Sequence, residues 1–258
     1  INKKEYSVNV VNGSGSLNVS DKLDANNYNV SAVFEGTSLY EESNATSNFT
    51  VSPVNTGLTA SDVAMVYNSG AKTMTVQATN IAEGSIISVK VNGKTLTGTV
   101  KNGKAIITIP ANLAAKTYPA TITFDGDANY NSATASAKVV VSKATPKLTA
   151  KAKTFKISVK TKKYTITLKD NTGKAIKNAK VTLKVKGKTY KATTNSKGKA
   201  TFKITKLAKK GTYKATITFN GDKNYKKATK KVKITIKPAF KTVSKGSKDK
   251  ATVRKITS

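Results

Sequence analysis

Apolar and polar residues alternate along most of the chain with a period of two. In one clear segment, lysine and threonine alternate with the apolar residues Tyr213, Ala215, Ile217 and Phe219. This alternation is typical of antiparallel strands that bury one face. No stretch shows a convincing 3.6-residue period, and a single helical turn is conceivable only at residues 111–116.

A tyrosine-led motif occurs three times. In each copy a tyrosine is followed by phenylalanine six residues later, glycine two residues further on, and a second tyrosine four residues after that. The copies are Tyr28, Phe34, Gly36 and Tyr40, then Tyr118, Phe124, Gly126 and Tyr130, and finally Tyr213, Phe219, Gly221 and Tyr225. Equal internal spacing predicts equivalent parts of a repeated module. The first tyrosine of each copy is predicted to be a tyrosine corner, with its hydroxyl bonded to upstream backbone.

Further alternating segments separate the motifs. We expect strands at residues 72–80, 85–91, 95–100 and 105–109, and again at 164–169, 181–186, 189–194 and 200–205. The pairs Asn92-Gly93 and Asn102-Gly103 are hairpin signals between neighbouring strands. About seven short strands per repeat predict an all-β chain of tandem immunoglobulin-like β-sandwich domains.

The repeat also predicts the domain boundaries. Residues 1–52 would be a partial domain with C-terminal strands only, 53–144 and 145–237 would be complete sandwiches, and 238–258 would be a basic tail. Short linkers that contain Pro53, Pro146 and Pro238 would keep neighbouring domains semi-rigid and stack them into a rod. A chain that opens at Ile1 is expected to be a fragment or a processed product.

Positive charge is concentrated in the last part of the chain. Residues 1–144 hold 11 Lys against 10 acidic residues, whereas residues 145–258 hold 34 Lys and Arg254 against three Asp. Such asymmetry predicts contact with a polyanion, although a solubility bias on solvated strand faces would produce the same pattern.

The turn-bearing segments resemble a known family. The Gly-Asp-x-Asn-Tyr loops within 117–143 and 211–237 resemble bacterial and archaeal Ig-like repeat domains. Residues 164–204 are similar to Ig-like modules of adhesin-like surface proteins of methanogenic archaea. The resemblance covers almost the whole chain except the tail, and it implies extracellular stalk and attachment modules without catalytic residues.

Few residues offer site chemistry. Asp125, Asp127 and Asn129 resemble the opening of a calcium loop, but the closing Glu is absent and a hydrogen-bonded turn explains the pattern better. We therefore expect no metal and no cofactor. Five Asn-x-Ser/Thr sequons are candidate N-glycosylation sites, and all fall in the first partial unit: Asn12, Asn18, Asn29, Asn44 and Asn48.

Catalysis is not expected. The chain has no Cys and no His, so triads built on them are impossible. The candidate acids Glu41, Glu42, Asp125 and Asp127 adjoin turns. We predict a non-catalytic adhesin-like or stalk segment at the extracellular cell surface or cell wall. Its repeats would act as a spacer, and its lysine-rich domain would bind an anionic surface polymer rather than a small molecule.

Two alternatives remain open. A purely structural spacer needs no ligand, and a basic domain can bind nucleic acid non-specifically. The scarcity of Arg and the core positions of the aromatic residues disfavour nucleic acid. No apolar run is long enough to span a membrane.

Overall fold

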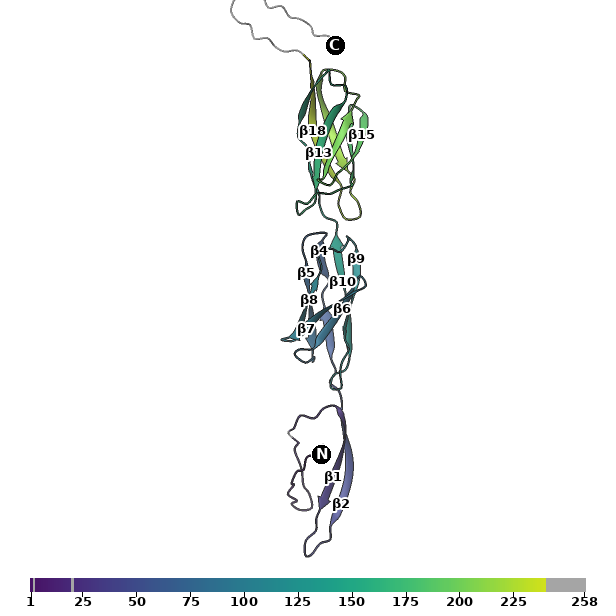
Figure 1. The fold of residues 1–258 in the computed structure, drawn as a ribbon. Helices are drawn as coiled ribbons and strands as arrows, with labels where there is room; N and C mark the ends of the chain where they lie inside the picture. Colours follow the sequence, from purple (N-terminus) through teal and green to yellow (C-terminus); the bar gives the residue numbers. More distant parts are fainter. Residues whose placement is uncertain (2, 20, 240–258) are drawn as a thin grey trace, which may run out of the picture. The chain divides into compact units, whose positions relative to one another are not determined.

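A computed structural model describes residues 1–239 apart from residues 2 and 20, and strands are the only regular structure in this part (Figure 1). The predicted all-β class is confirmed. Residues 111–116 form turns and bends, so the conceivable helical turn is absent. The tail from residue 240 onward lies outside the described residues. No helix in the described part could cross a membrane.

The chain groups into two compact units. The first holds residues 1–63, 73–109 and 118–139, and the second holds residues 64–72, 110–117 and the described residues from 140 onward. Each unit includes residues that are distant in sequence, because loops from one repeat contact the next.

The first sheet is a two-stranded ribbon. Strand β1 (Asn26–Phe34) pairs antiparallel with β2 (Ser43–Val51), and Tyr28 lies opposite Phe49 with the two rings stacked at a centroid distance of 5.3 Å. Apart from Tyr28 and Phe49, the apolar side chains of the ribbon are poorly covered. Phe34 at the end of β1, for example, is 45% exposed. Two strands bury far less apolar surface than a full sandwich.

The middle strands form one hydrogen-bonded sheet of eight strands in the order β3-β5-β8-β7-β6-β9-β10-β4. Their bounds are β3 Gly57–Ala60, β4 Val63–Val66, β5 Lys72–Thr79, β6 Ile86–Val91, β7 Lys94–Lys101, β8 Lys104–Ile109, β9 Thr117–Phe124 and β10 Ala133–Ser142. Asn92, Gly93, Asn102 and Gly103 all have positive φ, between 50° and 74°. The two predicted Asn-Gly hairpin turns are therefore confirmed, since turns with positive φ at both central residues match the twist of adjacent strands.

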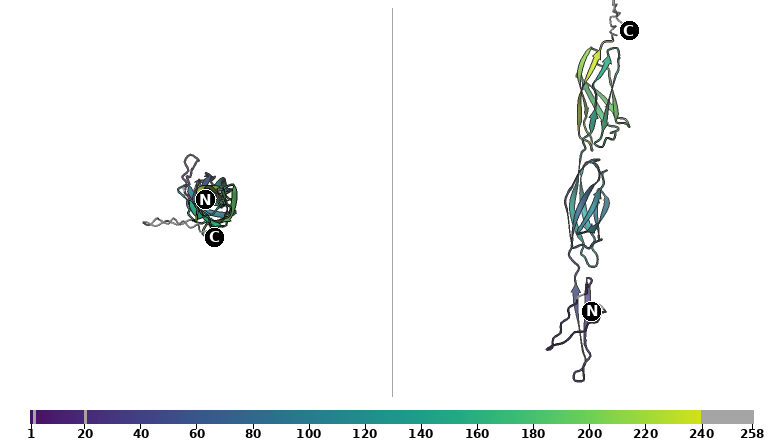
Figure 2. Two further views of the ribbon diagram at one scale, coloured as in Figure 1. Left: turned by 90° about the horizontal axis from the view of Figure 1, so that it is seen from above. Right: turned by 90° about the vertical axis from the view of Figure 1, so that its left-hand side faces the viewer.

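The C-terminal strands form a two-layered sandwich, which we call the C-terminal sandwich (Figure 2). One layer has the order β11-β13-β16 and the other β12-β18-β17-β14-β15. The bounds are β11 Lys147–Thr149, β12 Lys153–Lys156, β13 Lys162–Lys169, β14 Lys180–Val185, β15 Lys188–Thr193, β16 Lys199–Ile204, β17 Gly211–Phe219 and β18 Ala228–Lys237. Strand β12 pairs parallel with β18, and the other strand pairs of this sandwich are antiparallel. Two packed sheets with this strand content constitute an immunoglobulin-like sandwich.

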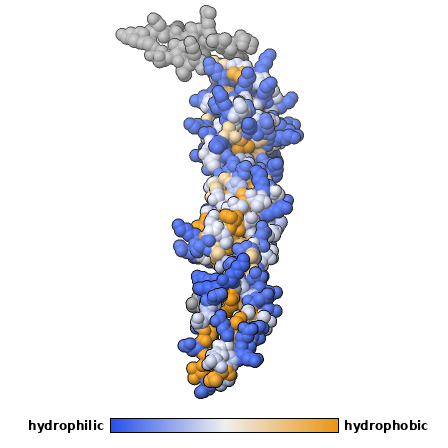
Figure 3. All heavy atoms as spheres, turned by 60° about the horizontal axis from the view of Figure 1, so that its bottom comes forward, coloured by the Kyte–Doolittle hydropathy of each residue, from blue (hydrophilic) through white to orange (hydrophobic). Residues whose placement is uncertain are grey.

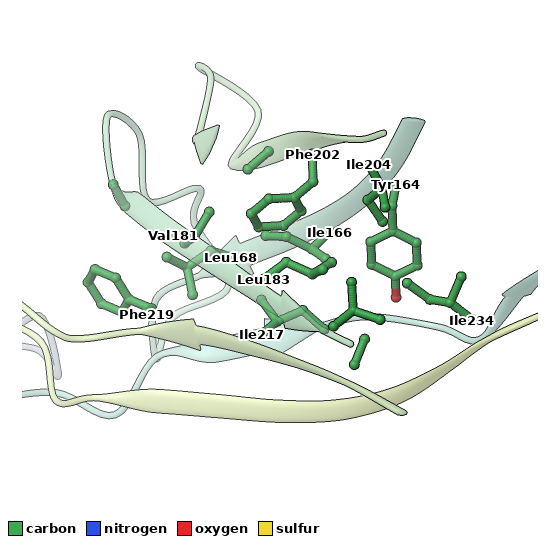
Figure 4. Packing of buried hydrophobic residues seen from close by; sticks show 14 of the residues in the cluster. Tyr164, Ile166, Leu168, Val181, Leu183, Phe202, Ile204, Ile217, Phe219 and Ile234 are labelled. Atoms are coloured by element: carbon green, nitrogen blue, oxygen red, sulfur yellow. The ribbon is translucent and has the colours of Figure 1, made fainter. Parts of the chain in front are cut away.

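The predicted alternation determines which side chains fill this core. Leu183, Phe202 and Ile217 are fully buried and lie between the two layers (Figure 4). Burial of each such side chain stabilises the fold by roughly 1.5–3 kcal/mol. The buried Tyr164 satisfies its hydroxyl by donating to the Lys151 carbonyl at 2.6 Å.

One inward position departs from the apolar pattern. Lys162 at the start of β13 is only 2% exposed, and its Nζ donates to the Val159 carbonyl at 2.6 Å. Burial lowers the pKa of this ammonium group, because the charged form is less well solvated there.

Candidate functional site

The first tyrosine of the motif anchors the start of a strand to the loop before it. Tyr28 donates its hydroxyl to the Asp24 carbonyl at 2.8 Å, and Tyr213 donates to the Lys209 carbonyl at 2.9 Å. In both cases the acceptor stands four residues upstream. Tyr118 is buried at the equivalent position. This is the arrangement of a tyrosine corner.

The motif glycine is required by the backbone. Gly36, Gly126 and Gly221 have φ values of 82°, 76° and 82°, which side-chain-bearing residues rarely adopt. A Cβ at Gly126 or Gly221 would also lie 2.6 Å from the carbonyl oxygen of the second tyrosine, Tyr130 or Tyr225. The equal spacing of glycine and tyrosine thus reflects a close backbone approach.

The remaining motif positions differ between copies. Phe124 and Phe219 are buried, whereas Phe34 is largely exposed. Among the second tyrosines, Tyr40 is exposed and Tyr225 is half-buried, with its ring edge-on to Tyr67 at a centroid distance of 5.4 Å. Burial, followed by the nearby charge of Asp170, raises the pKa of Tyr225 to about 12.

The five candidate glycosylation asparagines are all exposed. Asn29 on β1 lies directly opposite Asn48 on β2, and Asn44 lies opposite Val33 in the same ribbon. Asn12 has a φ of 52° in a tight turn, and Asn18 lies outside any strand. Each of these side chains is therefore accessible to solvent.

Lysines cover the C-terminal sandwich. Residues 145–237 contain 29 Lys, and all of them except Lys162 are exposed. Figure 3 shows hydrophilic residues over the visible face of this part, next to the grey residues. We call the exposed lysine side chains of residues 145–237 the lysine surface. Their distribution over both layers follows from the alternation, which places lysine at outward positions of nearly every strand.

Several lysines face each other across strands. Lys214 on β17 pairs with Lys233 on β18, Lys163 on β13 with Lys203 on β16, and Lys147 on β11 with Lys169 on β13. Like charges at directly opposite positions destabilise a sheet. No lysine of residues 145–237 forms an ion pair with a described residue, so the repulsion is not offset within the described part.

The two acidic residues of this stretch are engaged in turns. Asp222 accepts hydrogen bonds from the backbone N–H groups of Asn224 and Tyr225 at 2.8 and 2.9 Å. The buried Asp170 accepts from the Thr172 hydroxyl and from the N–H groups of Thr172 and Lys174, at 2.8–2.9 Å. Burial alone would raise the pKa of Asp170, but these hydrogen bonds and one from Asn68 outweigh it and hold the pKa below its usual value.

The described residues include no cluster of the kind that holds a metal ion. No cluster of three or more His, Cys, Asp or Glu residues occurs among them. The Asp125-x-Asp127-x-Asn129 pattern forms a turn in which Asp127 Oδ1 accepts from the N–H groups of Asn129 and Tyr130. The Asp127 carboxylate is therefore used by hydrogen bonds within the turn.

Sequence reasoning predicted the outward lysines but missed their pairing. The lysine-on-lysine register depends on which strands become neighbours, and alternation alone does not specify this. It also missed the hydrogen bonds that the Asn of the Gly-Asp-x-Asn-Tyr loops accepts, from the Ala25 N–H to Asn129 and from the Ala115 N–H to Asn224. The recurrence of that Asn in two copies was the available signal.

Comparison with known proteins identifies no family for this chain. No protein-family model and no curated protein matches it. Similar solved structures include a 1.5-MDa bacterial ice-binding adhesin, at 16% identity over 81% of this chain and 74% of that chain, with a TM-score of 0.36. They also include invasin, a bacterial integrin-binding protein, at 19% identity over 70% of this chain and 39% of that chain, with a TM-score of 0.46. The Z1Z2 domains of titin match at 13% identity over 74% of this chain and all of that chain, with a TM-score of 0.44. Similarity this weak carries no argument about function.

Proposed function

We propose that this chain is a non-catalytic, adhesin-like segment of a cell-surface or cell-wall protein. Its lysine surface binds an anionic surface polymer, and its Ig-like domains, at residues 53–144 and 145–237, act as spacer modules. The partial unit at residues 1–52 precedes them. The assignment to surface proteins of the archaeal type rests on the resemblance of the repeat sequences.

The observation that carries the proposal is the set of facing lysine pairs. Lys214 opposite Lys233 and Lys163 opposite Lys203 place close positive charges on both layers of the sandwich. Maintaining such pairs costs stability, whereas a bound polyanion would attract both lysines and offset their repulsion. Outward residues along a strand repeat about every 7 Å, so a flexible polymer with regularly spaced charges can contact several lysines at once.

The chemistry of the surface favours a flexible polymer over nucleic acid. Lys presents a hydrated point charge, whereas Arg supplies the planar fork used to read base edges. The aromatic side chains of residues 145–237 are all buried or half-buried, so the described surface provides no stacking platform for bases. Electrostatic retention requires neither feature.

The test measures binding of the full chain to polygalacturonate and to polyphosphate across a salt series. We expect log affinity to fall linearly with log salt concentration. The double variant Lys214→Thr/Lys233→Thr should weaken binding and lower the salt slope by roughly 1 per contacting lysine. The control Lys90→Thr/Lys101→Thr removes the same charge from the middle strands and should change little.

Two outcomes would contradict the proposal. Binding that is absent or insensitive to salt would remove the electrostatic part and leave a spacer without a ligand. Tighter binding to duplex DNA than to either polymer at equal salt would favour the nucleic-acid alternative.

The sequons extend the proposal to the first ribbon. Exposed Asn29, Asn44 and Asn48 would carry glycans on a secreted protein. Mass spectrometry of peptides from the native protein would detect glycosylated asparagines, and unmodified peptides throughout would refute this part.

A further inference from the structure

The Gly-Asp-x-Asn-Tyr loop has the same internal geometry in two copies. Asp127 donates its N–H to the Tyr130 carbonyl at 2.9 Å, and Asp222 donates to the Tyr225 carbonyl at 3.1 Å. In both loops the Asp carboxylate accepts the N–H groups of the following Asn and Tyr. The carboxylate is therefore used inside the turn, and the side chain of the Asn is left to bond elsewhere.

That Asn side chain reaches the preceding repeat. Asn129 Oδ1 accepts the N–H of Ala25 at 2.7 Å, and Asn224 Oδ1 accepts the N–H of Ala115 at 3.0 Å. Ala25 and Ala115 each stand three residues before a corner tyrosine. The first contact lies within the first compact unit and the second within the second unit. The same bond thus forms twice at equivalent positions.

The backbone of the same Asn holds the segment that connects the repeats. Val54 donates to the Asn129 carbonyl at 2.8 Å, and Ala144 donates to the Asn224 carbonyl at 2.9 Å. Val54 and Ala144 each stand three residues after the end of an apolar run, at Val51 and Val141. Each loop Asn therefore binds two parts of the preceding repeat, the loop before its corner tyrosine and the segment that leads out of it.

The first copy of the motif forms the same turn although it lacks the Asn. It has Thr37 and Leu39 where the other copies have Asp and Asn. The turn still forms, because Thr37 donates to the Tyr40 carbonyl and its hydroxyl accepts the Leu39 N–H at 3.2 Å. Leu39 is 84% exposed. The turn does not require Asn, so its presence in the other two copies needs another reason.

We propose that this Asn is a coupling residue, and that its loop is a docking site for the end of another repeat. The partner group is the backbone N–H three residues before a corner tyrosine. In the C-terminal sandwich that group belongs to Lys210, three residues before Tyr213. The Lys210 N–H makes no hydrogen bond with any described residue. It is the receiving group for a further repeat that carries the same loop.

Additional contacts reinforce the second site. Asn171 donates to the Tyr67 carbonyl at 3.2 Å, and Asn68 donates to Asp170 Oδ2 at 3.3 Å. The edge-on contact of Tyr67 with Tyr225 places an aromatic pair beside the loop Asn. Loss of the Asn224 bond should therefore loosen this site without separating its parts completely.

The coupling is tested by hydrogen exchange on the full chain. We expect the amides of Ala25 and Ala115 to be protected and that of Lys210 to exchange freely. Asn224→Leu, which copies position 39, should speed exchange at Ala115 roughly fivefold and leave Ala25 unchanged. Asn129→Leu should do the reverse. Asn220→Ala, in an exposed position of the same loop, is the matched control.

A second measurement reports on coupling rather than on local structure. The chain has no Cys, so Lys90→Cys and Lys184→Cys can carry spin labels for distance measurements. Asn224→Leu should broaden the distance distribution, and Ala115→Pro, which removes the donor from the other side, should broaden it equally. Unchanged widths in both variants, or equal exchange at Ala115 and Lys210 in the unmodified chain, would overturn the proposal. Neither result depends on polyanion binding.

Discussion

Lys214 on β17 lies directly opposite Lys233 on β18 in an antiparallel register. Two ammonium groups at facing positions repel, and no described acidic residue pairs with either of them. The C-terminal sandwich therefore tolerates a local cost in stability that substitution of either lysine would remove.

Lys233→Glu should raise the stability of the C-terminal sandwich by about 0.2–1 kcal/mol, because attraction replaces repulsion. The gain should shrink as salt screens the pair. Urea unfolding at low and high salt, followed by exchange of the β17 amides, would measure it. Lys231→Glu is the matched control, because Lys231 lies on the same strand opposite Thr216. An equal gain in both variants would show that net charge, rather than the facing pair, is responsible.

Gly221→Ala should destabilise the loop that carries Asn224. The new Cβ would meet the Tyr225 carbonyl oxygen at 2.6 Å in a left-handed conformation. We expect a loss of about 1–3 kcal/mol, measured by thermal unfolding. Gly173→Ala has a similar φ but open space around it, so its loss should be about 1 kcal/mol. Equal losses would refute the close approach as the cause.

Tyr225 should ionise near pH 12, because burial and the charge of Asp170 disfavour its phenolate. A tyrosine absorbance titration should show a late-ionising group that disappears in Tyr225→Phe. The pKa in the folded state is raised above the unfolded value of 10.0. The hydroxyl therefore contributes stability that is complete below pH 10 and lost as the pH rises towards 12. A variant whose stability changes in parallel with the unmodified chain over this range would contradict the assignment.

Asp170→Asn should destabilise the C-terminal sandwich by about 1–3 kcal/mol, because the hydroxyl and N–H donors around this buried carboxylate lose a charged acceptor. The pKa of Asp170 is lowered in the folded state. Its contribution is therefore present above the unfolded pKa of 3.8 and is lost as the pH falls through the folded value. Unfolding measured between pH 7 and pH 2 should show a weaker acid dependence in the variant. An unchanged dependence would assign acid sensitivity to other groups.

The strands were predictable because the alternation is strict. The segment from Tyr213 to Phe219 has lysine and threonine on one face, and the structure buries Ala215, Ile217 and Phe219 on the other. The first copy follows the same spacing, yet its Phe34 is exposed. Burial depends on what covers a face, and periodicity does not report this. The buried Lys162 escaped prediction for the same reason.

By itself, the sequence determined the strand positions, the turns at Asn-Gly and Gly-Asp, and the lysines on outward faces, since these depend on neighbours within a few residues. Only the tertiary structure decided the parallel pairing of β12 with β18, the facing of Lys214 and Lys233, and the bond from Ala115 to Asn224. Side-chain alternation specifies the face on which a residue lies. The partner across the strand or loop depends on how distant segments pack together, and local pattern contains no record of that choice.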